Sequence, residues 1–313
     1  MTPRKDGFVL VCVLWVLVVL TIITVSFGRK AVLERRAAAY ALDHDQALNM
    51  ARGAVQRGMV ELCNKAHKDV ALNPAQRGSY TGLDQSWRIH PTLTEEGYLT
   101  IEEPGNGDTV TYIIRDESSR ISVNRAPKEI LDKIEGLGVR GAEQIVSLRG
   151  ISGDPKPREP FLILEQVLEL DGVDKDAWTG SEDKPGLRGL LTCWGSGKIN
   201  VNTASRQVLE HIPDMAPGVV DAILAYRSGS DGQPETNDDR AFSSVADLIE
   251  KTQLDASLLG PVAKFCTLDS QFFTITGLAT QRQGKIRAVC EATVEIRNGV
   301  SRILQWREDP SGA

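Results

Sequence analysis

Residues 8–27 form a run of twenty residues without a charged side chain, FVLVCVLWVLVVLTIITVSF. At about 1.5 Å per residue, a helix of this length spans about 30 Å, the thickness of the hydrocarbon core of a bilayer. A cleaved secretory signal is the alternative, but its apolar region is usually about 7–15 residues long and ends in a small-x-small cleavage site. The run here continues into Gly28-Arg29-Lys30 without such a site. We therefore expect one uncleaved membrane-spanning helix, and no later segment is apolar enough to be a second.

The helical pattern continues beyond the apolar run, up to Asn73-Pro74, where proline disfavours the helical conformation of the residue before it. Residues 28–72 are therefore expected to be an exposed amphipathic helix. Small or apolar side chains recur on it every three or four residues and form one narrow face: Ala47, Ala51, Ala54, Gly58 and Leu62. We expect this face to pack against similar helices of partner subunits, because small side chains permit close approach.

Charge and cysteine usage leave two questions open. The formal charge is −6, but the first 40 residues hold six basic and two acidic side chains, so the rest of the chain sums to about −10. An acidic body disfavours nucleic acid as the main partner, while basic residues on both sides of the span leave the membrane orientation undecided.

Cys63, Cys193, Cys266 and Cys290 are compatible either with two disulfides or with four buried thiols.

The N-terminus resembles the prepilin class of type IV pilins and type II secretion pseudopilins. A short basic leader ends in Gly7 and is followed by Phe8 and the apolar helix. The resemblance implies that residues 1–7 are a leader, that a prepilin peptidase cuts between Gly7 and Phe8, and that Phe8 is then N-methylated. It also implies a cytoplasmic N-terminus, a single pass through the inner membrane and a periplasmic body.

Cys12 departs from the pattern of that class, in which most members carry glutamate at the fifth residue after the cut. In a filament that glutamate is thought to pair with the terminal amine of the subunit ahead. A carboxylate in lipid is costly unless such a partner exists, and a subunit at the tip has no subunit ahead of it. A thiol at position 12 therefore suits a tip subunit. The alternative interpretation is that Cys12 is an ordinary apolar residue of the membrane-spanning helix.

A repeat at an offset of 78 residues dominates the body of the chain. Residues 118–150, SSRISVNRAPKEILDKIEGLGVRGAEQIVSLRG, align with residues 196–227, SGKINVNTASRQVLEHIPDMAPGVVDAILAYR. Each copy is predicted to be a strand end, a helix starting near Ala126 or Ala204, a tight turn, and a second helix ending at an arginine. Asn124 and Asn202 are predicted to satisfy free backbone amides at the helix starts.

The turn of the first copy, residues 136–141, matches G-x-G-x-x-G, but it follows a helix where a dinucleotide-binding unit needs a strand. A helix-hairpin-helix that presents backbone amides to DNA phosphate is the sharper alternative. The first copy, with a net charge of +2, favours it. The second copy, with no net charge and two prolines in its turn, does not. We expect the hairpins to be structural, with no nucleic acid as partner.

The paired repeats, joined to a pilin-like N-terminus, resemble the minor pseudopilin K family of type II secretion. The motifs that carry the resemblance are DESSRISVN at 116–124, GLRGLLTCWGSGKINVNTAS at 186–205 and FFTITG at 272–277. Strands are predicted at 98–102, 109–115, 272–277, 285–297 and 301–307, with Asn298-Gly299 as a two-residue hairpin turn. The expected fold class is α+β. It combines a pilin-like long N-terminal helix and small antiparallel sheet (residues 73–119 and 268–309) with an all-α insertion of duplicated helix-hairpin-helix or SAM-like units (120–267).

No pattern in the sequence indicates catalysis, because it contains no nucleophile elbow, phosphate-binding loop or H-E-x-x-H motif. The chain is therefore expected not to be an enzyme. Two acidic loops, at 171–176 and around 231–239, could supply the oxygen ligands that calcium prefers, without EF-hand spacing. The calcium candidates are Asp231, Glu235, Asp238 and Asp239; calcium occurs in the family that the chain resembles, but no cofactor is required by the sequence.

The resemblance implies a minor pseudopilin that caps the periplasmic pseudopilus and supports export of folded proteins across the outer membrane. Its implied partners are I- and J-type minor pseudopilins, the major pseudopilin, the prepilin peptidase and the inner membrane. An insertion of about 148 residues should clash inside a closely packed fibre but has room at its end. The alternative function is a membrane-anchored DNA-binding protein of a competence system, with a secreted hydrolase as a weaker third.

Overall fold

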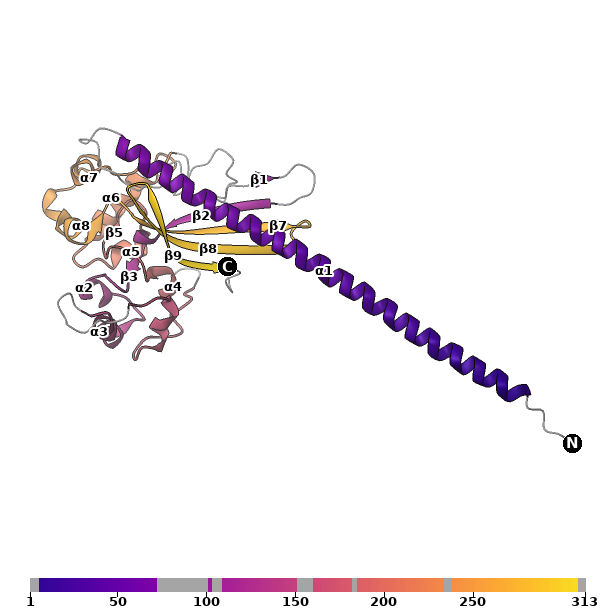
Figure 1. The fold of residues 1–313 in the computed structure, drawn as a ribbon. Helices are drawn as coiled ribbons and strands as arrows, with labels where there is room; N and C mark the ends of the chain where they lie inside the picture. The colour runs from indigo at the N-terminus through magenta and orange to yellow at the C-terminus, as the bar shows by residue number, and fades with distance from the viewer. Residues whose placement is uncertain are drawn as a thin grey trace.

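The computed structural model describes residues 6–71, 101–102, 109–150, 160–181, 185–233 and 238–308. Figure 1 shows a long N-terminal helix, a sheet that lies along it, and a group of short helices beside the sheet. The elements in chain order are α1 (Asp6–Ala71), β1 (Ile101–Glu102), β2 (Thr109–Asp116), η2 (Glu117–Ser119), β3 (Ile121–Ser122), α2 (Lys128–Leu131), α3 (Gly138–Arg149), η3 (Leu164–Glu169), α4 (Leu187–Leu190), β4 (Leu191–Thr192), β5 (Ile199–Asn200), α5 (Arg206–Glu210), α6 (Pro217–Arg227), α7 (Val245–Thr252), η4 (Ala256–Leu259), α8 (Gly260–Phe265), β6 (Cys266–Thr267), β7 (Phe272–Gln281), β8 (Ile286–Arg297) and β9 (Val300–Glu308).

Helix α1 confirms the predicted continuous N-terminal helix. Its 66 residues correspond to about 99 Å at 1.5 Å per residue, and its N-terminal part projects beyond the rest of the protein (Figure 1). The described apolar side chains from Leu10 to Phe27 are exposed. Among the residues that the structure describes, α1 is the one helix long and apolar enough to cross a membrane. Its length and composition therefore fit a membrane anchor that continues into a stem.

The sheet has the order β1-β2-β7-β8-β9, and every neighbouring pair is antiparallel. This confirms the predicted strands at the two ends of the body, although β7 extends to Gln281, four residues beyond the expected end. Asn298 and Gly299 both have positive φ angles (52° and 76°), as a tight two-residue hairpin turn requires. The antiparallel sheet is thus built from chain segments on both sides of the repeats.

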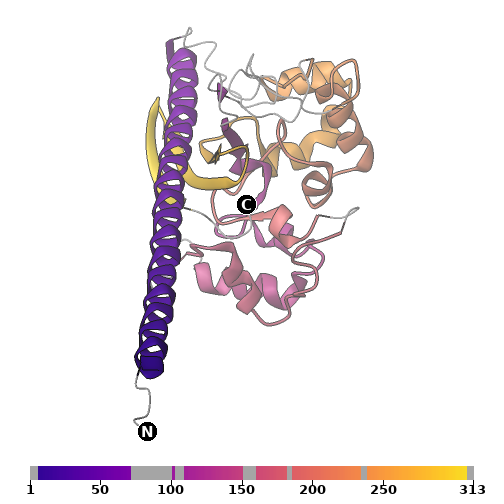
Figure 2. The same ribbon diagram turned by 90° about the vertical axis from the view of Figure 1, so that its right-hand side faces the viewer.

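The C-terminal half of α1 packs on one face of this sheet. Figure 2 shows the helix running alongside the sheet, with the short helices on the other side. Apolar side chains of the sheet that alternate toward the helix, including Tyr112, Ile114, Phe273 and Ile275, form one core with it. At Gly277 a Cβ atom would collide with the carbonyl oxygen of Ala51, so the backbones of helix and sheet approach closely.

The prediction that the narrow face of α1 packs against partner subunits is wrong. Ala47, Ala51 and Leu62 are at most 2% exposed, and Ala54 is 5% exposed, because they lie on the protein's own sheet. A Cβ atom on Gly58 would lie 2.8 Å from Cγ2 of Ile275. The small side chains of this face therefore serve an intramolecular contact.

A second core is formed by the part of the chain that lies between β2 and β7 in sequence. Its buried residues run from Ile121 to Cys266. It contains two similar units, which we call the first unit (residues 121–193) and the second unit (199–268). Each unit has a helical hairpin, α2–α3 or α5–α6, and the second helices end at Arg149 and Arg227 as predicted.

The units are not entirely helical, which corrects the expectation of an all-α segment. Each is closed by a two-stranded parallel ladder, β3 with β4 in the first unit and β5 with β6 in the second. In both, the strand that opens the unit pairs with the strand that ends it, so the chain returns to its starting point. The two ladders sit beside the end of the sheet and bring the units into contact with it.

Candidate functional site

The predicted processing residues lie at the free end of α1. The helix begins at Asp6, so Gly7 and Phe8 belong to its first turn, but their side chains and residues 1–5 lie outside the described part of the chain. Cys12 is exposed on the apolar part of α1 and is a free thiol. The cleavage, methylation and tip-position roles of these residues stay predictions.

The prediction that Asn124 and Asn202 cap helices is wrong. Helix α2 begins after Pro127, which provides no side-chain cap, and α5 begins after Ser205. The Ser205 hydroxyl accepts a hydrogen bond from the amide of Val208 at 3.3 Å, which is the bond expected of an N-cap. Both asparagines lie upstream of these caps and have a different role.

Each asparagine ties together three segments of its own unit. Nδ2 of Asn124 donates to the carbonyls of Phe161 (2.8 Å) and Cys193 (2.7 Å), and its Oδ1 accepts from the amide of Phe161 (2.8 Å). Asn202 repeats this arrangement with the carbonyl (2.9 Å) and amide (2.8 Å) of Phe242 and the carbonyl of Leu268 (3.4 Å). The conserved geometry of two equivalent residues shows that the sequence repeat is a structural repeat.

Arg149 and Arg227 complete this arrangement. Arg149 donates to the carbonyls of Val123 (2.8 Å) and Ala126 (2.6 Å), and Arg227 donates to those of Val201 (3.1 Å) and Ala204 (2.6 Å). Each arginine therefore binds the segment that opens its own unit. The sequence analysis did not assign this role, although these two residues are the one identical charged pair in the aligned repeats.

Asp116, at the end of β2, is the centre of a buried polar network that joins the sheet to the second unit. Its Oδ2 accepts hydrogen bonds from Nδ2 of Asn200 (2.9 Å) and from the hydroxyls of Thr203 (2.6 Å) and Ser270 (2.7 Å). Its Oδ1 accepts from the amide of Ser118 (2.7 Å). Burial raises the pKa of Asp116 above its ordinary value, and the donated hydrogen bonds offset this only in part.

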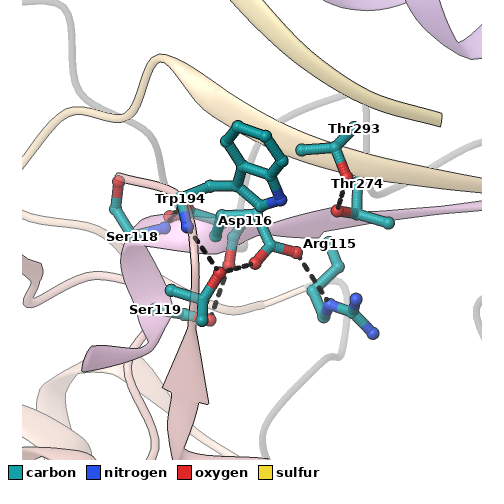
Figure 3. A network of polar contacts seen from close by, with 9 residues as sticks. Arg115, Asp116, Ser118, Ser119, Trp194, Thr274 and Thr293 are labelled. Atoms are coloured by element: carbon teal, nitrogen blue, oxygen red, sulfur yellow. Dashed lines mark hydrogen bonds and ion pairs between the residues drawn. The ribbon is translucent and has the colours of Figure 1, made fainter. Parts of the chain in front are cut away.

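Glu117, the next residue, joins the sheet to the first unit. Its Oε2 accepts from the hydroxyl of Thr192 (2.5 Å), and its Oε1 accepts from Nε of Arg115 (3.2 Å), as Figure 3 shows for the network around Arg115 and Trp194. Burial opposes ionisation of Glu117, but Arg115, Arg120 and the Thr192 hydroxyl outweigh it and lower its pKa. Neither carboxylate was identified from the sequence, because the partners that connect them to the two units and to Ser270 lie between 75 and 154 residues away.

In the acidic loop around residues 231–239, Asp231 and Asp238 accept hydrogen bonds from groups of the same loop. Oδ2 of Asp238 accepts from the amide (2.5 Å) and hydroxyl (2.6 Å) of Ser230 and from the amide of Asp231 (3.2 Å). Asp239 is buried, at 6% exposure, and Glu235 lies outside the described residues. Within the described ranges, no group of three or more His, Cys, Asp or Glu side chains is placed to hold a metal ion. Calcium binding by these residues therefore stays a prediction.

The glycine turn that suggested DNA binding packs against the other acidic loop. The amide of Asp174 donates to the carbonyl of Gly136 (2.7 Å), and a Cβ atom on Gly138 would lie 2.9 Å from the carbonyl oxygen of Gly172. Gly136 and Gly138 also have positive φ angles (84° and 67°), which favour glycine. Turn geometry and close packing beside a loop of three aspartates account for these glycines without a phosphate ligand.

The five cysteines are free thiols. Cys193, Cys266 and Cys290 are buried, Cys63 is half-buried and Cys12 is exposed. Burial raises the pKa of both Cys193 and Cys266 to about 12, so neither is a reactive thiolate near neutral pH. Of the two alternatives left open by the sequence, the structure shows unpaired thiols.

Comparison with known proteins relates the chain to others through its structure. No family model matches the chain, and no curated protein matches its sequence. A solved structure described as the GspK-GspI-GspJ complex from the type 2 secretion system of enterotoxigenic Escherichia coli contains a chain with 13% sequence identity and a TM-score of 0.58. The match covers 88% of this chain and the whole of the other. The protein therefore has the fold of a subunit of the GspK-GspI-GspJ complex.

Proposed function

We propose that this protein is a minor pseudopilin of a type II secretion system with a structural rather than an enzymatic role. The observation that supports the proposal most strongly is the fold. A long helix with an apolar end, a small antiparallel sheet and a pair of helical units together match the whole of one chain from a pseudopilin complex. In this interpretation residues 120–267 are an insertion in a pilin-like domain.

The proposed processing follows from the prepilin-like N-terminus. Residues 1–7 are removed by a prepilin peptidase, Phe8 becomes the methylated first residue, and the apolar part of α1 remains in the inner membrane. The exposed apolar side chains from Leu10 to Phe27 support an anchor, because they find no partner on the rest of the described protein. The body of the protein would then be periplasmic.

The proposed position is the tip of the pseudopilus, together with I- and J-type minor pseudopilins and above the major pseudopilin. Two observations support it. Cys12 replaces the glutamate that would pair with a subunit ahead, and the two helical units add bulk beside the stem that a closely packed fibre would not accommodate. Support for the export of folded proteins through the outer membrane follows from that position.

The surface for partner stems must differ from the narrow face, which is covered by the sheet. Between the membrane anchor and the sheet, α1 exposes Val32 (49%), Leu33 (64%), Tyr40 (56%) and Leu42 (64%). Apolar side chains exposed on a helix that continues from a membrane span are suited to packing against the stems of neighbouring subunits. We assign the stem contact to this segment.

The proposal is tested in cells that carry the remaining secretion components. Mass spectrometry of the purified native protein should show a methylated phenylalanine as the first residue. The protein should co-purify with I- and J-type minor pseudopilins, and Leu33→Asp with Tyr40→Asp should abolish this, whereas Arg36→Asp on the same segment should weaken it less. An N-terminus that still begins with methionine, or that lacks the apolar run, contradicts the proposal.

The structure of the glycine turn does not favour DNA binding. The hairpin turn that could present amides to phosphate is packed beside Asp174 and its neighbours, and the body is acidic. Retention of the protein on DNA at 150 mM salt would revive this alternative.

A further inference from the structure

A pocket of about 160 Å³ lies between the sheet and the first unit. Its floor includes Thr274 and Thr293, which project from the face of the sheet that points away from α1 and whose hydroxyls lie 3.0 Å apart (Figure 3). Arg115 and Arg307 contribute from the sheet side, and Arg188 and Trp194 from the side of the first unit. Because both walls belong to packed elements, the pocket is formed in the absence of a ligand.

Arginine is the most frequent residue type in the lining of this pocket. Four of them, Arg115, Arg120, Arg188 and Arg307, meet three glutamates, Glu117, Glu165 and Glu291. Glu117 is already engaged by Arg115 and Thr192. Among the described residues, neither Arg120 nor Arg188 has a carboxylate oxygen within ion-pair distance. Within the described ranges, two guanidinium groups thus line the pocket without a direct ion pair, although Glu117 and Glu291 act on Arg120 over a longer distance.

The electrostatic environment of Arg120 supports this description. Burial, followed by the positive charges of Arg115 and Arg188, lowers the pKa of Arg120 to about 10, although Glu117 and Glu291 act in the opposite direction. The charged form of Arg120 is therefore less stable here than in water, and an anion between these guanidinium groups would offset the repulsion. Guanidinium groups bind carboxylates and phosphates through pairs of parallel hydrogen bonds, so the pocket is suited to an oxyanion.

The edge of the pocket distinguishes between oxyanions. Leu162 is 61% exposed and Ile163 is 41% exposed, and both line the pocket. A free phosphate or a nucleic acid backbone offers no apolar group to cover these side chains. A protein segment can place a carboxylate against the arginines and an apolar side chain against Leu162 and Ile163.

We propose that this pocket binds a carboxylate of a partner protein, either an acidic side chain or a C-terminal carboxylate, that is flanked by an apolar residue. The inference rests on the chemistry of the pocket and does not depend on the proposed role in secretion. It assigns to the junction between sheet and first unit a recognition function in addition to its structural one.

The test uses the full-length protein in detergent and fluorescence anisotropy with labelled tripeptides. One peptide ends in leucine with a free C-terminal carboxylate, and its control is the same peptide with an amidated end. A third, amidated peptide carries glutamate beside leucine, and its control has glutamine instead. We expect one of the two carboxylate peptides to bind at least tenfold more tightly than its control, which also identifies the source of the carboxylate. Inorganic phosphate should compete only weakly.

Variants locate the binding to this pocket. Arg120→Gln and Arg188→Gln should each weaken binding of that peptide about tenfold, as expected for loss of a charge-assisted hydrogen bond, and Leu162→Ser should weaken it severalfold. Arg140→Gln, which removes an exposed arginine of the first unit outside the pocket, should leave affinity unchanged. Arg188 is exposed, so its variant remains informative if Arg120→Gln fails to fold.

Three results would each overturn the inference. The first is that neither carboxylate peptide binds more tightly than its neutral control. The second is binding that Arg120→Gln and Arg188→Gln leave unchanged. The third is phosphate binding as tightly as the carboxylate peptide together with no effect of Leu162→Ser, which would make the pocket a general anion site.

Discussion

Asp116 and Glu117 are consecutive buried carboxylates that bind different units of the protein. Asp116 accepts hydrogen bonds from Asn200 and Thr203 of the second unit, while Glu117 accepts one from Thr192 of the first. Two residues at the end of β2 therefore connect the sheet to both units. Asp116 binds the second unit because that unit has Asn200, which donates to Asp116, at the position where the first unit has Ser122. This junction determines how the units are held against the sheet.

Replacement of Asp116 by asparagine should destabilise the protein strongly. The amide group would present donors to Asn200, Thr203 or Ser270, and leaving buried polar groups unsatisfied costs about 2–3 kcal/mol in the free energy of unfolding. Urea denaturation of the detergent-solubilised protein measures the change. Asp132→Asn, at an exposed aspartate paired with Lys128, is the matched control and should change stability by less than about 0.5 kcal/mol.

The two carboxylates should respond to pH in opposite directions. The pKa of Glu117 is lowered in the folded protein, so its contribution to stability is present above its ordinary value of 4.5 and is lost as the pH falls through the folded value. The pKa of Asp116 is raised, so its ionisation reduces stability as the pH rises from its ordinary value of 3.8 through the folded value.

Urea midpoints recorded from pH 7 to pH 3 test these signs. Compared with the unchanged protein, Glu117→Gln should lose less stability on acidification and Asp116→Asn should lose more. Parallel pH profiles for the two variants would show that the carboxylates do not differ in environment.

The clamp formed by Asn202 should contribute more to stability than the helix cap beside it. Asn202→Ala removes three hydrogen bonds to buried backbone groups and should cost about 2–3 kcal/mol, whereas Ser205→Ala removes one N-cap bond and should cost about 1 kcal/mol. Asn124→Ala, at the less buried of the two asparagines, should fall between them. If Asn202 were the helix cap, Ser205→Ala would be neutral, and thermal unfolding monitored by circular dichroism would show this.

Two glycine-to-alanine changes probe the contact between α1 and the sheet. Gly277→Ala should lower stability by about 1–3 kcal/mol, because its Cβ atom would push the sheet away from the Ala51 carbonyl. Gly53→Ala lies on α1 with no atom within 4 Å of the added Cβ atom, and it should raise stability by about 0.5–1 kcal/mol. A neutral effect at Gly277 would mean that helix and sheet are less closely packed than described.

The sequence alone determined the features that depend on neighbouring residues. An uncharged run of twenty residues and a helical spacing up to Asn73 are local properties, and they predicted α1 almost to its last residue. The same holds for the turn at Asn298-Gly299 and for the helical hairpins that end at Arg149 and Arg227.

Tertiary structure alone decided which surface each side chain meets. The spacing of Ala47, Ala51 and Ala54 showed a face suited to close packing, but whether its partner is a neighbouring subunit or the protein's own sheet is not a property of the helix. Asn124 and Asn202 are of a residue type that often caps helices, yet their hydrogen-bond partners lie 37 to 69 residues away in sequence. Hydrogen bonds and packing act over a few ångströms in space, so contacts between distant segments exist only after the chain has folded.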